Sequence, residues 1–193
     1  MRRPALLVMD LINEIVHPEG KYAGDGYLEQ VRRRGVLDHA AEAISLARAQ
    51  GIPVLYVVVG FSSDYAEWPE TSPVFREARD DRRIVLGTWA TQVHDQLKPA
   101  EDEPVVAKHR LSPFHGTDLD GLLRARNVNT LLLTGVTTDL VVLSAAREAH
   151  DRDFAVEVLE DATATSDDAL HQAALTVLAR TATISSVRQA LAG

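Results

Sequence analysis

Two ionisable side chains stand directly after short apolar runs, where an acid and a base could exchange a proton with a bound molecule. Asp10 follows Leu6–Met9, and Lys108 follows Val105–Ala107. In an open parallel α/β sheet, ligands bind beyond the carboxyl ends of the strands, so the two side chains are expected to converge there. A lysine at such a buried position must find a partner or change its pKa. The structural alternative is a plain ion pair that holds two strand ends together.

A third polar run follows the apolar segment Thr130–Leu133 and opens a helix. It reads Thr134-Gly135-Val136-Thr137-Thr138-Asp139-Leu140-Val141-Val142. The hydroxyls of Thr137, Thr138 and Ser144 lie near the helix start, but a hydroxyl nucleophile needs an adjacent base. Helix capping and packing explain these residues as well. The chain contains no cysteine, so a thiolate nucleophile, thiol ligands and disulfides are excluded.

The elements that must position these residues are short apolar runs alternating with longer helical patterns. Such alternation predicts a parallel sheet with helices on both faces. The expected strands are Ala5–Met9, Pro53–Val59, Pro104–Ala107, Thr130–Leu133, Ala155–Leu159 and Ala182–Ser185. The expected helices are Leu28–Gln50, Asp118–Arg126, Asp139–Asp151, Asp167–Arg180 and Val187–Leu191. The irregular segment Gly60–Pro104 is a long insertion, which is usually functional or interfacial.

Composition and charge exclude several classes of function. The chain has 193 residues, of which 46% are hydrophobic and 25% charged, as in an ordinary globular protein. Its net charge of -8 argues against nucleic acid as a partner. No stretch approaches the roughly 20 apolar residues that span a bilayer, so we expect no membrane association and a cytoplasmic location.

Taken together, these motifs resemble the isochorismatase-like (cysteine) hydrolases over nearly the whole chain. The resemblance rests first on four segments in order, which are Leu7–Asn13, Gly51–Val54, Lys108–Leu119 and the Gly-Val-x-Thr run from Gly135. The third of them contains a run like Ser-x-Phe-x-x-Thr-x-Leu. Glu160-Asp161-Ala162 and His171 follow later in the chain and also match. It implies one hydrolase domain over residues 1–193. The expected fold is a three-layer α/β/α Rossmann-like domain with about six parallel strands in the order 3-2-1-4-5-6.

In cysteine members, the resemblance implies an Asp–Lys–Cys triad that cleaves amides through a covalent intermediate. The aspartate takes the thiol proton, the lysine favours the thiolate, and backbone N–H groups near the Gly-Val-x turn hold an oxyanion. Asp10 and Lys108 match the first two positions, whereas Val141 stands where the nucleophile should be. Valine has no lone pair and no proton, so cysteine-dependent amidase chemistry is excluded.

Two interpretations of the site remain. In the first, Asp10 and Lys108 act on water or directly on a small metabolite, cleaving a non-peptide C–N, ether or ester bond. True isochorismatases, which lack the cysteine and cleave a vinyl ether, are the precedent. This chain departs from them, because it has Val141 for their glycine, Thr137 for their tyrosine and apolar Val58-Val59-Gly60 in place of a glutamine. In the second, the chain is a catalytically inactive protein that binds a small molecule in the same crevice.

Further residues are candidates for lining the substrate site. They are Val136 and Thr137 in the turn, the aromatic residues Phe61 and Phe114, and the polar residues His115 and Asn13. Structural roles explain the last four as well, since aromatic residues also dominate cores and interfaces.

The sequence predicts no cofactor and no metal. It lacks a Gly-x-Gly-x-x-Gly motif after the first strand and a Walker-type loop. Nicotinamidases, another branch of the resembling family, bind a metal after the second strand, but the corresponding stretch Val59–Trp68 contains no histidine. The resemblance also implies a homo-oligomer, a dimer or tetramer, with Gly60–Pro104 and the helix after Gly135 supplying the contacts.

Overall fold

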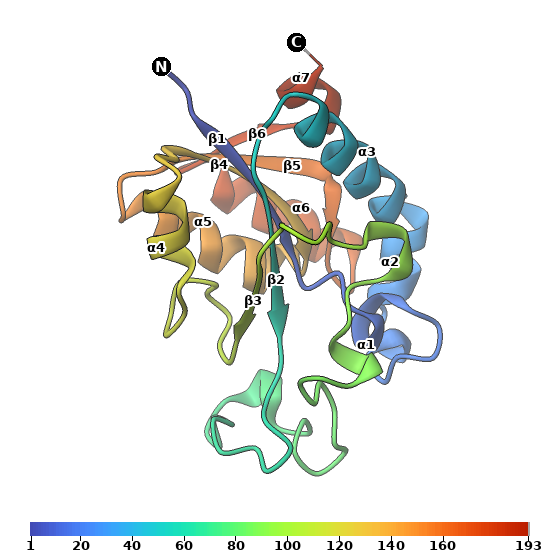
Figure 1. Ribbon diagram of the computed structural model, residues 1–193. Helices are drawn as coiled ribbons and strands as arrows, with labels where there is room; N and C mark the ends of the chain where they lie inside the picture. Colours follow the sequence, from blue (N-terminus) through green and yellow to red (C-terminus); the bar gives the residue numbers. More distant parts are fainter. Residues whose placement is uncertain (193) are drawn as a thin grey trace.

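The computed structural model describes residues 1–192 and contains a six-stranded, all-parallel sheet. The strands are β1 (Pro4–Met9), β2 (Val54–Val59), β3 (Val105–Lys108), β4 (Thr130–Val136), β5 (Ala155–Ala164) and β6 (Thr183–Ser185). Their order is β3-β2-β1-β4-β5-β6, which confirms the expected Rossmann-like topology (Figure 1). Strands β2 and β3 extend the sheet on one side of β1, and β4, β5 and β6 extend it on the other side, so the strand order switches between β1 and β4. Ligands of such sheets bind at this switch point.

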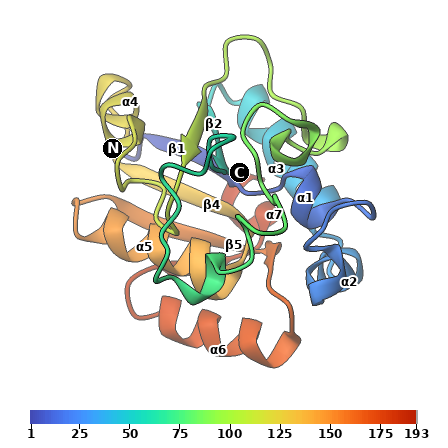
Figure 2. The ribbon, with the colours of Figure 1, turned by 90° about the horizontal axis from the view of Figure 1, so that it is seen from below.

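Helices cover both faces of the sheet. They are α1 (Asn13–Val16), α2 (Tyr27–Arg33), α3 (Val36–Ala49), α4 (Leu119–Ala125), α5 (Leu143–His150), α6 (Asp168–Leu178) and α7 (Val187–Leu191). Seen from below, α4, α5 and α6 lie on one side of the sheet and the other four helices on the opposite side (Figure 2). None of the helices among residues 1–192 combines the length and the apolar character that a membrane crossing requires.

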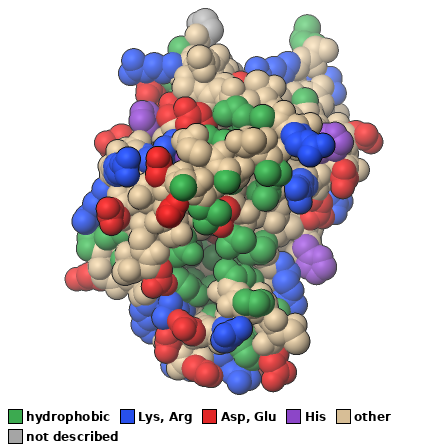
Figure 3. Space-filling model, turned by 180° about the vertical axis from the view of Figure 1, so that it is seen from behind, with side chains coloured by type: hydrophobic (Ala, Val, Ile, Leu, Met, Phe, Trp, Pro, Cys, Tyr) green, Lys and Arg blue, Asp and Glu red, His purple; other side chains and the backbone are tan. Residues whose placement is uncertain are grey.

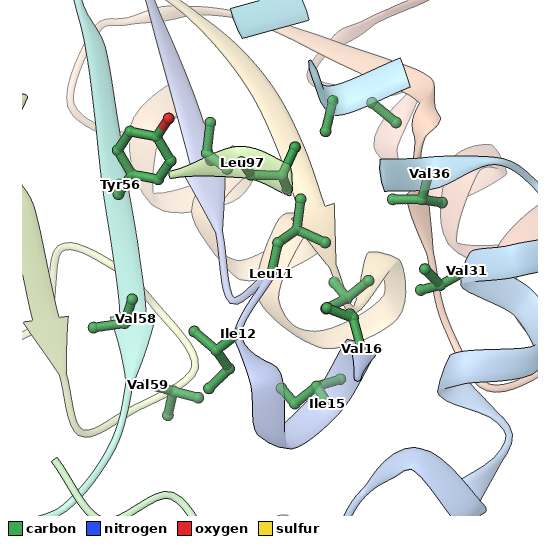
Figure 4. Close-up of a cluster of buried hydrophobic side chains, with 14 of the residues drawn as sticks. Leu11, Ile12, Ile15, Val16, Val31, Val36, Tyr56, Val58, Val59 and Leu97 are labelled. Atoms are coloured by element: carbon green, nitrogen blue, oxygen red, sulfur yellow. The ribbon is translucent and has the colours of Figure 1, made fainter. Parts of the chain in front are cut away.

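The two faces of the sheet bury separate hydrophobic clusters, because successive side chains of a strand point to opposite faces. In β1, Leu6 and Val8 belong to the cluster under α3 and α7. Leu7 and Met9 belong to the cluster under α4, α5 and α6. Figure 4 shows part of the first cluster, where side chains of β2 and α1 pack together. The near-continuous apolar strands in the sequence are explained by this burial on both sides.

Three local features differ from the sequence-based expectation. The expected helix Leu28–Gln50 is two helices, because Gly35 has φ 63°, a left-handed conformation that ends α2 and starts α3. The short helix α1 has no counterpart in the expectation, since four residues give too little periodicity to detect. The expected helix Asp139–Asp151 begins with a π-helical turn, η5 (Thr138–Val142), that leads into α5.

The irregular segment 60–104 lies beyond the carboxyl ends of β1 and β2, and much of it forms the lower lobe in Figure 1. It contains the 3₁₀ turns η2 (Pro73–Phe75), η3 (Trp89–Thr91) and η4 (Asp95–Leu97). Phe75, Ala78 and Ile84 from this segment are buried in the first hydrophobic cluster. The insertion is therefore packed onto the body of the domain, and it closes one side of the space beyond the strands.

Candidate active site

Asp10 and Lys108 meet beyond the ends of two strands, as expected from the sequence. Lys108 Nζ lies 2.8 Å from Asp10 Oδ2. Asp10 directly follows β1 and Lys108 is the last residue of β3. These two strands flank β2, and the register pairs Val59 of β2 with Lys108. Both side chains are almost fully buried, with exposed fractions of 1% and 0%. The sheet therefore brings an acid and a base into direct contact at its carboxyl edge.

Two further hydrogen bonds fix this pair. The Val59 N–H donates to Asp10 Oδ1 at 2.7 Å, and Lys108 Nζ donates to the Arg110 carbonyl at 3.0 Å. Burial raises the pKa of the Asp10 carboxyl, and the nearby Lys108 ammonium and the Val59 N–H oppose that shift. Asp10 also has φ 54°, a left-handed conformation that aspartate and asparagine tolerate better than most residues. The carboxylate is thus held in one place in a water-poor environment.

The turn after β4 passes very close to β1, and glycine is required there. Gly135 has φ 123°, and a Cβ atom on it would lie 2.0 Å from the Met9 carbonyl oxygen. The following peptide bond, between Val136 and Thr137, is cis. The Thr137 carbonyl then accepts the N–H groups of Val141 and, at 3.0 Å, of Val142. The glycine of the Gly-Val-x-Thr run thus has a physical explanation in the packing of two central strands.

The first turn of η5 presents unpaired donors. Among residues 1–192, no acceptor pairs with the N–H groups of Thr138, Asp139 and Leu140, as is usual for the start of a helix. The side chain of Thr138 instead points into the protein, where its Oγ1 lies 2.8 Å from Nδ1 of the buried His171. Desolvation lowers the pKa of His171 to about 4, so this histidine is neutral at physiological pH. The contact ties the turn to α6.

A pocket of about 70 Å³ opens beside the ion pair. Its walls include Asp10, Lys108, Val136, Thr137 and Val141, so five of the residues selected from the sequence share one cavity. Val141, which the sequence motif leads us to expect in the nucleophile's place, is 6% exposed. The remaining walls come mainly from apolar and tyrosine side chains of other segments, which are Ile15, Tyr22, Tyr27, Val59, Val74, Phe75, Ile84, Leu111 and Leu140. Figure 3 shows a hollow lined by hydrophobic side chains on the rear face of the molecule.

The other four residues selected from the sequence lie outside this pocket. Phe61 is fully buried and packs against Phe75. Phe114 stacks on Phe154 in the opposite cluster. The Asn13 amide donates to the Trp89 carbonyl at 3.0 Å and anchors η3. His115 borders a separate surface depression with Ser112 and Glu148.

Sequence reasoning missed Tyr22 and Tyr27, which line the pocket from the segment that leads into α2. Both rings are partly buried. Neither stands at a strand end, which was the positional signal that selected Asp10 and Lys108. The one sequence signal for them was the presence of two tyrosines between the first expected strand and the first expected helix, where no element was assigned.

The part of the chain that the structure describes contains no cluster of side chains that could bind a metal ion. There, no group of three or more histidine, aspartate or glutamate side chains is placed to hold an ion. The metal-free site stays a prediction of the sequence.

Together, the fold and the site indicate the class of enzyme scaffold to which the chain belongs. A parallel α/β domain that holds a buried Asp–Lys pair beside a turn with unpaired N–H groups is a hydrolase scaffold of the kind suggested by the sequence motifs. The Isochorismatase domain model matches residues 4–189, so the chain belongs to the isochorismatase family of hydrolases.

Particular relatives support this assignment. A ureidoacrylate amidohydrolase from Methylobacterium radiotolerans is 34% identical over 184 residues, which cover 88% of this chain and 70% of the relative. An isochorismatase family protein from Desulfovibrio vulgaris has a TM-score of 0.86 and 27% identity, with both chains covered completely. The N-carbamoylsarcosine amidase of Thermoplasma acidophilum has a TM-score of 0.75 and 30% identity, with 97% of each chain covered.

Proposed function

We propose that the protein hydrolyses a small metabolite without a cysteine nucleophile, and that Asp10 and Lys108 form its polar catalytic centre. The observation that carries this proposal is the buried pair itself, on the wall of the pocket and 2.8 Å apart. Removing two charged groups from water costs free energy that their mutual attraction often fails to recover. Perturbed ionisable groups in a cleft are therefore candidates for chemistry.

In the proposed reaction, Asp10 takes a proton from the attacking water and delivers it to the leaving group, and Lys108 balances the charge of the carboxylate. Water is the nucleophile, because Val141 can form no covalent intermediate with the substrate. Of the three residues with unpaired N–H groups, Leu140 lines the pocket, and its N–H is suited to stabilise negative charge that develops on a substrate oxygen. The scissile bond is a non-peptide C–N, ether or ester bond.

Isochorismate is not the substrate that we propose. The second strand ends in apolar residues at Val58 and Val59, and Val141 occupies space that a glycine would leave open. The amide-cleaving relatives named above also give no direct guide to the reaction, because the cysteine route of the family is closed to this chain.

A second candidate function is a binding protein without catalysis. It is favoured by the small size of the pocket, about 70 Å³ against roughly 300–1,000 Å³ for typical ligand sites. It is also favoured by the direct contact of Asp10 with Lys108, since an ion pair can serve structure alone.

A hydrolysis screen that includes a blocked pocket separates these candidates. Wild type, Val141→Phe and the control Val177→Phe, a half-exposed position on the surface of α6, are assayed on a panel of small esters, amides and enol ethers. We expect wild type and Val177→Phe to hydrolyse at least one compound, and Val141→Phe to lose that activity while it still melts cooperatively. No hydrolysis by folded wild type would contradict the proposal and favour the binding protein.

A further inference from the structure

The walls of the pocket carry no unbalanced charge. Asp10 and Lys108 are in contact at 2.8 Å, and no arginine or histidine side chain among residues 1–192 lines the cavity. A carboxylate in this pocket would have no cation of its own, and burying an unpaired anion is strongly unfavourable. The net charge of -8 adds to this unfavourable potential for anions.

Among the fully buried side-chain polar atoms of the pocket, the Thr137 hydroxyl has neither a hydrogen-bond partner nor an ion-pair partner within residues 1–192. Thr137 lines the cavity and is 6% exposed, and its Oγ1 has no hydrogen-bond partner within the described residues. A buried hydroxyl is normally paired, and an exception needs an explanation. Because a hydroxyl rotates freely and can donate, a ligand with one acceptor atom would satisfy it.

Most of the remaining cavity surface is apolar, apart from the hydroxyl groups of Tyr22 and Tyr27. Leu140 and Val141 approach from η5, the ring of Tyr22 approaches from the segment before α2, and the ring of Tyr27 approaches from the first residue of α2. The volume of about 70 Å³ leaves room for only a short apolar body. The hollow in Figure 3 is accordingly surrounded by hydrophobic side chains.

We propose that this pocket takes small uncharged molecules, in which one acceptor oxygen meets Thr137 Oγ1 and a short apolar group lies against Val141, and that it rejects carboxylates of the same shape. The inference rests on the proposed function, because it names the substrate class of the same site. It also separates this chain from the relative named after ureidoacrylate, since an acrylate carries a carboxylate group.

A matched pair of probes tests the inference by binding alone. Isobutyramide and isobutyrate have nearly the same shape, but only the second is an anion at pH 8. Each is titrated into the protein while the labelled methyl groups of Val141 and Leu140 are followed by NMR. We expect isobutyramide to bind at least about tenfold more tightly than isobutyrate.

A pair of variants identifies the atom responsible. Thr137→Val keeps the shape and removes the hydroxyl, and we expect it to weaken isobutyramide binding about 3- to 10-fold. Thr176→Val is the matched control, because Thr176 lies on the exposed side of α6 and bonds only within its helix. The control should bind isobutyramide as wild type does, and thermal melting verifies that both variants fold.

Three results would overturn the inference. They are equal binding of the two probes, unchanged binding of isobutyramide by Thr137→Val, and no binding of either probe up to its solubility limit. The outcome is independent of the hydrolysis screen. Hydrolysis of a carboxylate compound would support the proposed function and refute this substrate class, whereas selective binding without turnover would do the opposite.

Discussion

At the scale of single residues, we propose that one substitution decides what chemistry this site can perform. In this proposal Val141 takes the place of the family nucleophile, and groups that could activate a thiol surround it. Lys108 lines the same pocket, and the N–H groups at the start of η5 have no acceptor within residues 1–192. Both features favour a thiolate at residue 141. Such a thiolate forms by passing its proton to Asp10, so it adds no net charge to the pocket, whereas a carboxylate ligand would add one.

We therefore predict that Val141→Cys creates an activated thiol. The change reduces side-chain volume only slightly at the edge of a pocket, so the variant should fold. At pH 7 its thiol should react with iodoacetamide at least about tenfold faster than that of Val177→Cys on the surface of α6, because its pKa should be lowered. A rate equal to or below that of the control would show that the turn no longer stabilises an anion.

The Asp10–Lys108 pair predicts a pH-dependent loss of stability in Lys108→Met. The variant leaves a buried carboxylate without its cation, which should lower the free energy of unfolding by about 3–5 kcal/mol at pH 8. Lys108 lowers the pKa of Asp10, so its removal raises that pKa further above the unfolded value. When the pKa of Asp10 is higher in the folded state than in the unfolded state, ionisation at high pH destabilises the folded state, and protonation at lower pH relieves that penalty. The loss of unfolding free energy in Lys108→Met should therefore be smaller at pH 5 than at pH 8.

Urea unfolding at both pH values checks this prediction. Lys98→Met serves as the control, because Lys98 is 69% exposed and pairs with Asp95 on the surface. The control should unfold almost as wild type does at either pH. A loss in Lys108→Met that is the same at pH 5 and pH 8 would mean that Asp10 does not carry the effect.

At the scale of elements, the close pairing of the parallel strands β1 and β4 sets the position of the turn after β4. Gly135→Ala would place a Cβ atom 2.0 Å from the Met9 carbonyl at φ 123°. We predict a loss of stability on the order of 3–5 kcal/mol, from strain and overpacking together. Gly121→Ala, on the open surface of α4, should instead be stabilising by about 0.5–1 kcal/mol. Thermal or urea unfolding of both variants gives the comparison, and a neutral Gly135→Ala would contradict the packing argument.

Elements with a strong sequence signal were predicted well. The strand Thr130–Leu133 was placed correctly but extends to Val136 in the structure, because Gly135 and Val136 continue the pairing with β5. The break at Gly35 was missed because a single glycine inside a helical pattern is often tolerated. The π-helical turn η5 leaves no periodicity of its own, so it could not be distinguished from the start of a normal helix.

The candidate site was predictable only where it depends on strand ends. Asp10 and Lys108 could be placed together because the fold rule brings strand ends to one edge. Tyr22 and Phe75 reach the pocket from irregular segments, whose path depends on tertiary contacts such as the bond from Ile84 N–H to Glu14. For the same reason the sequence left open whether Phe61 lines the site or packs in the core, where its ring lies in the structure.

At the scale of the whole molecule, we propose that the protein forms a homo-oligomer. The segment 60–104 was expected to supply contacts, and Val74 and Trp89 within it expose 37% and 41% of their surface. Large exposed apolar side chains often mark interfaces. Size-exclusion chromatography with light scattering should give a dimer or tetramer of the 21.1 kDa chain. A monomer over the working concentration range would refute this expectation.

The central claim is that Asp10 carries the chemistry of this cysteine-free site. Its most direct test is the kcat/KM of Asp10→Asn on the best substrate from the hydrolysis screen. The matched control is Asp153→Asn, an exposed position with φ 64° that resembles the φ 54° of Asp10. We predict a loss of about 100- to 10,000-fold for Asp10→Asn, in a variant that remains folded, and wild-type activity for Asp153→Asn. An Asp10→Asn variant with wild-type kcat/KM would contradict the account.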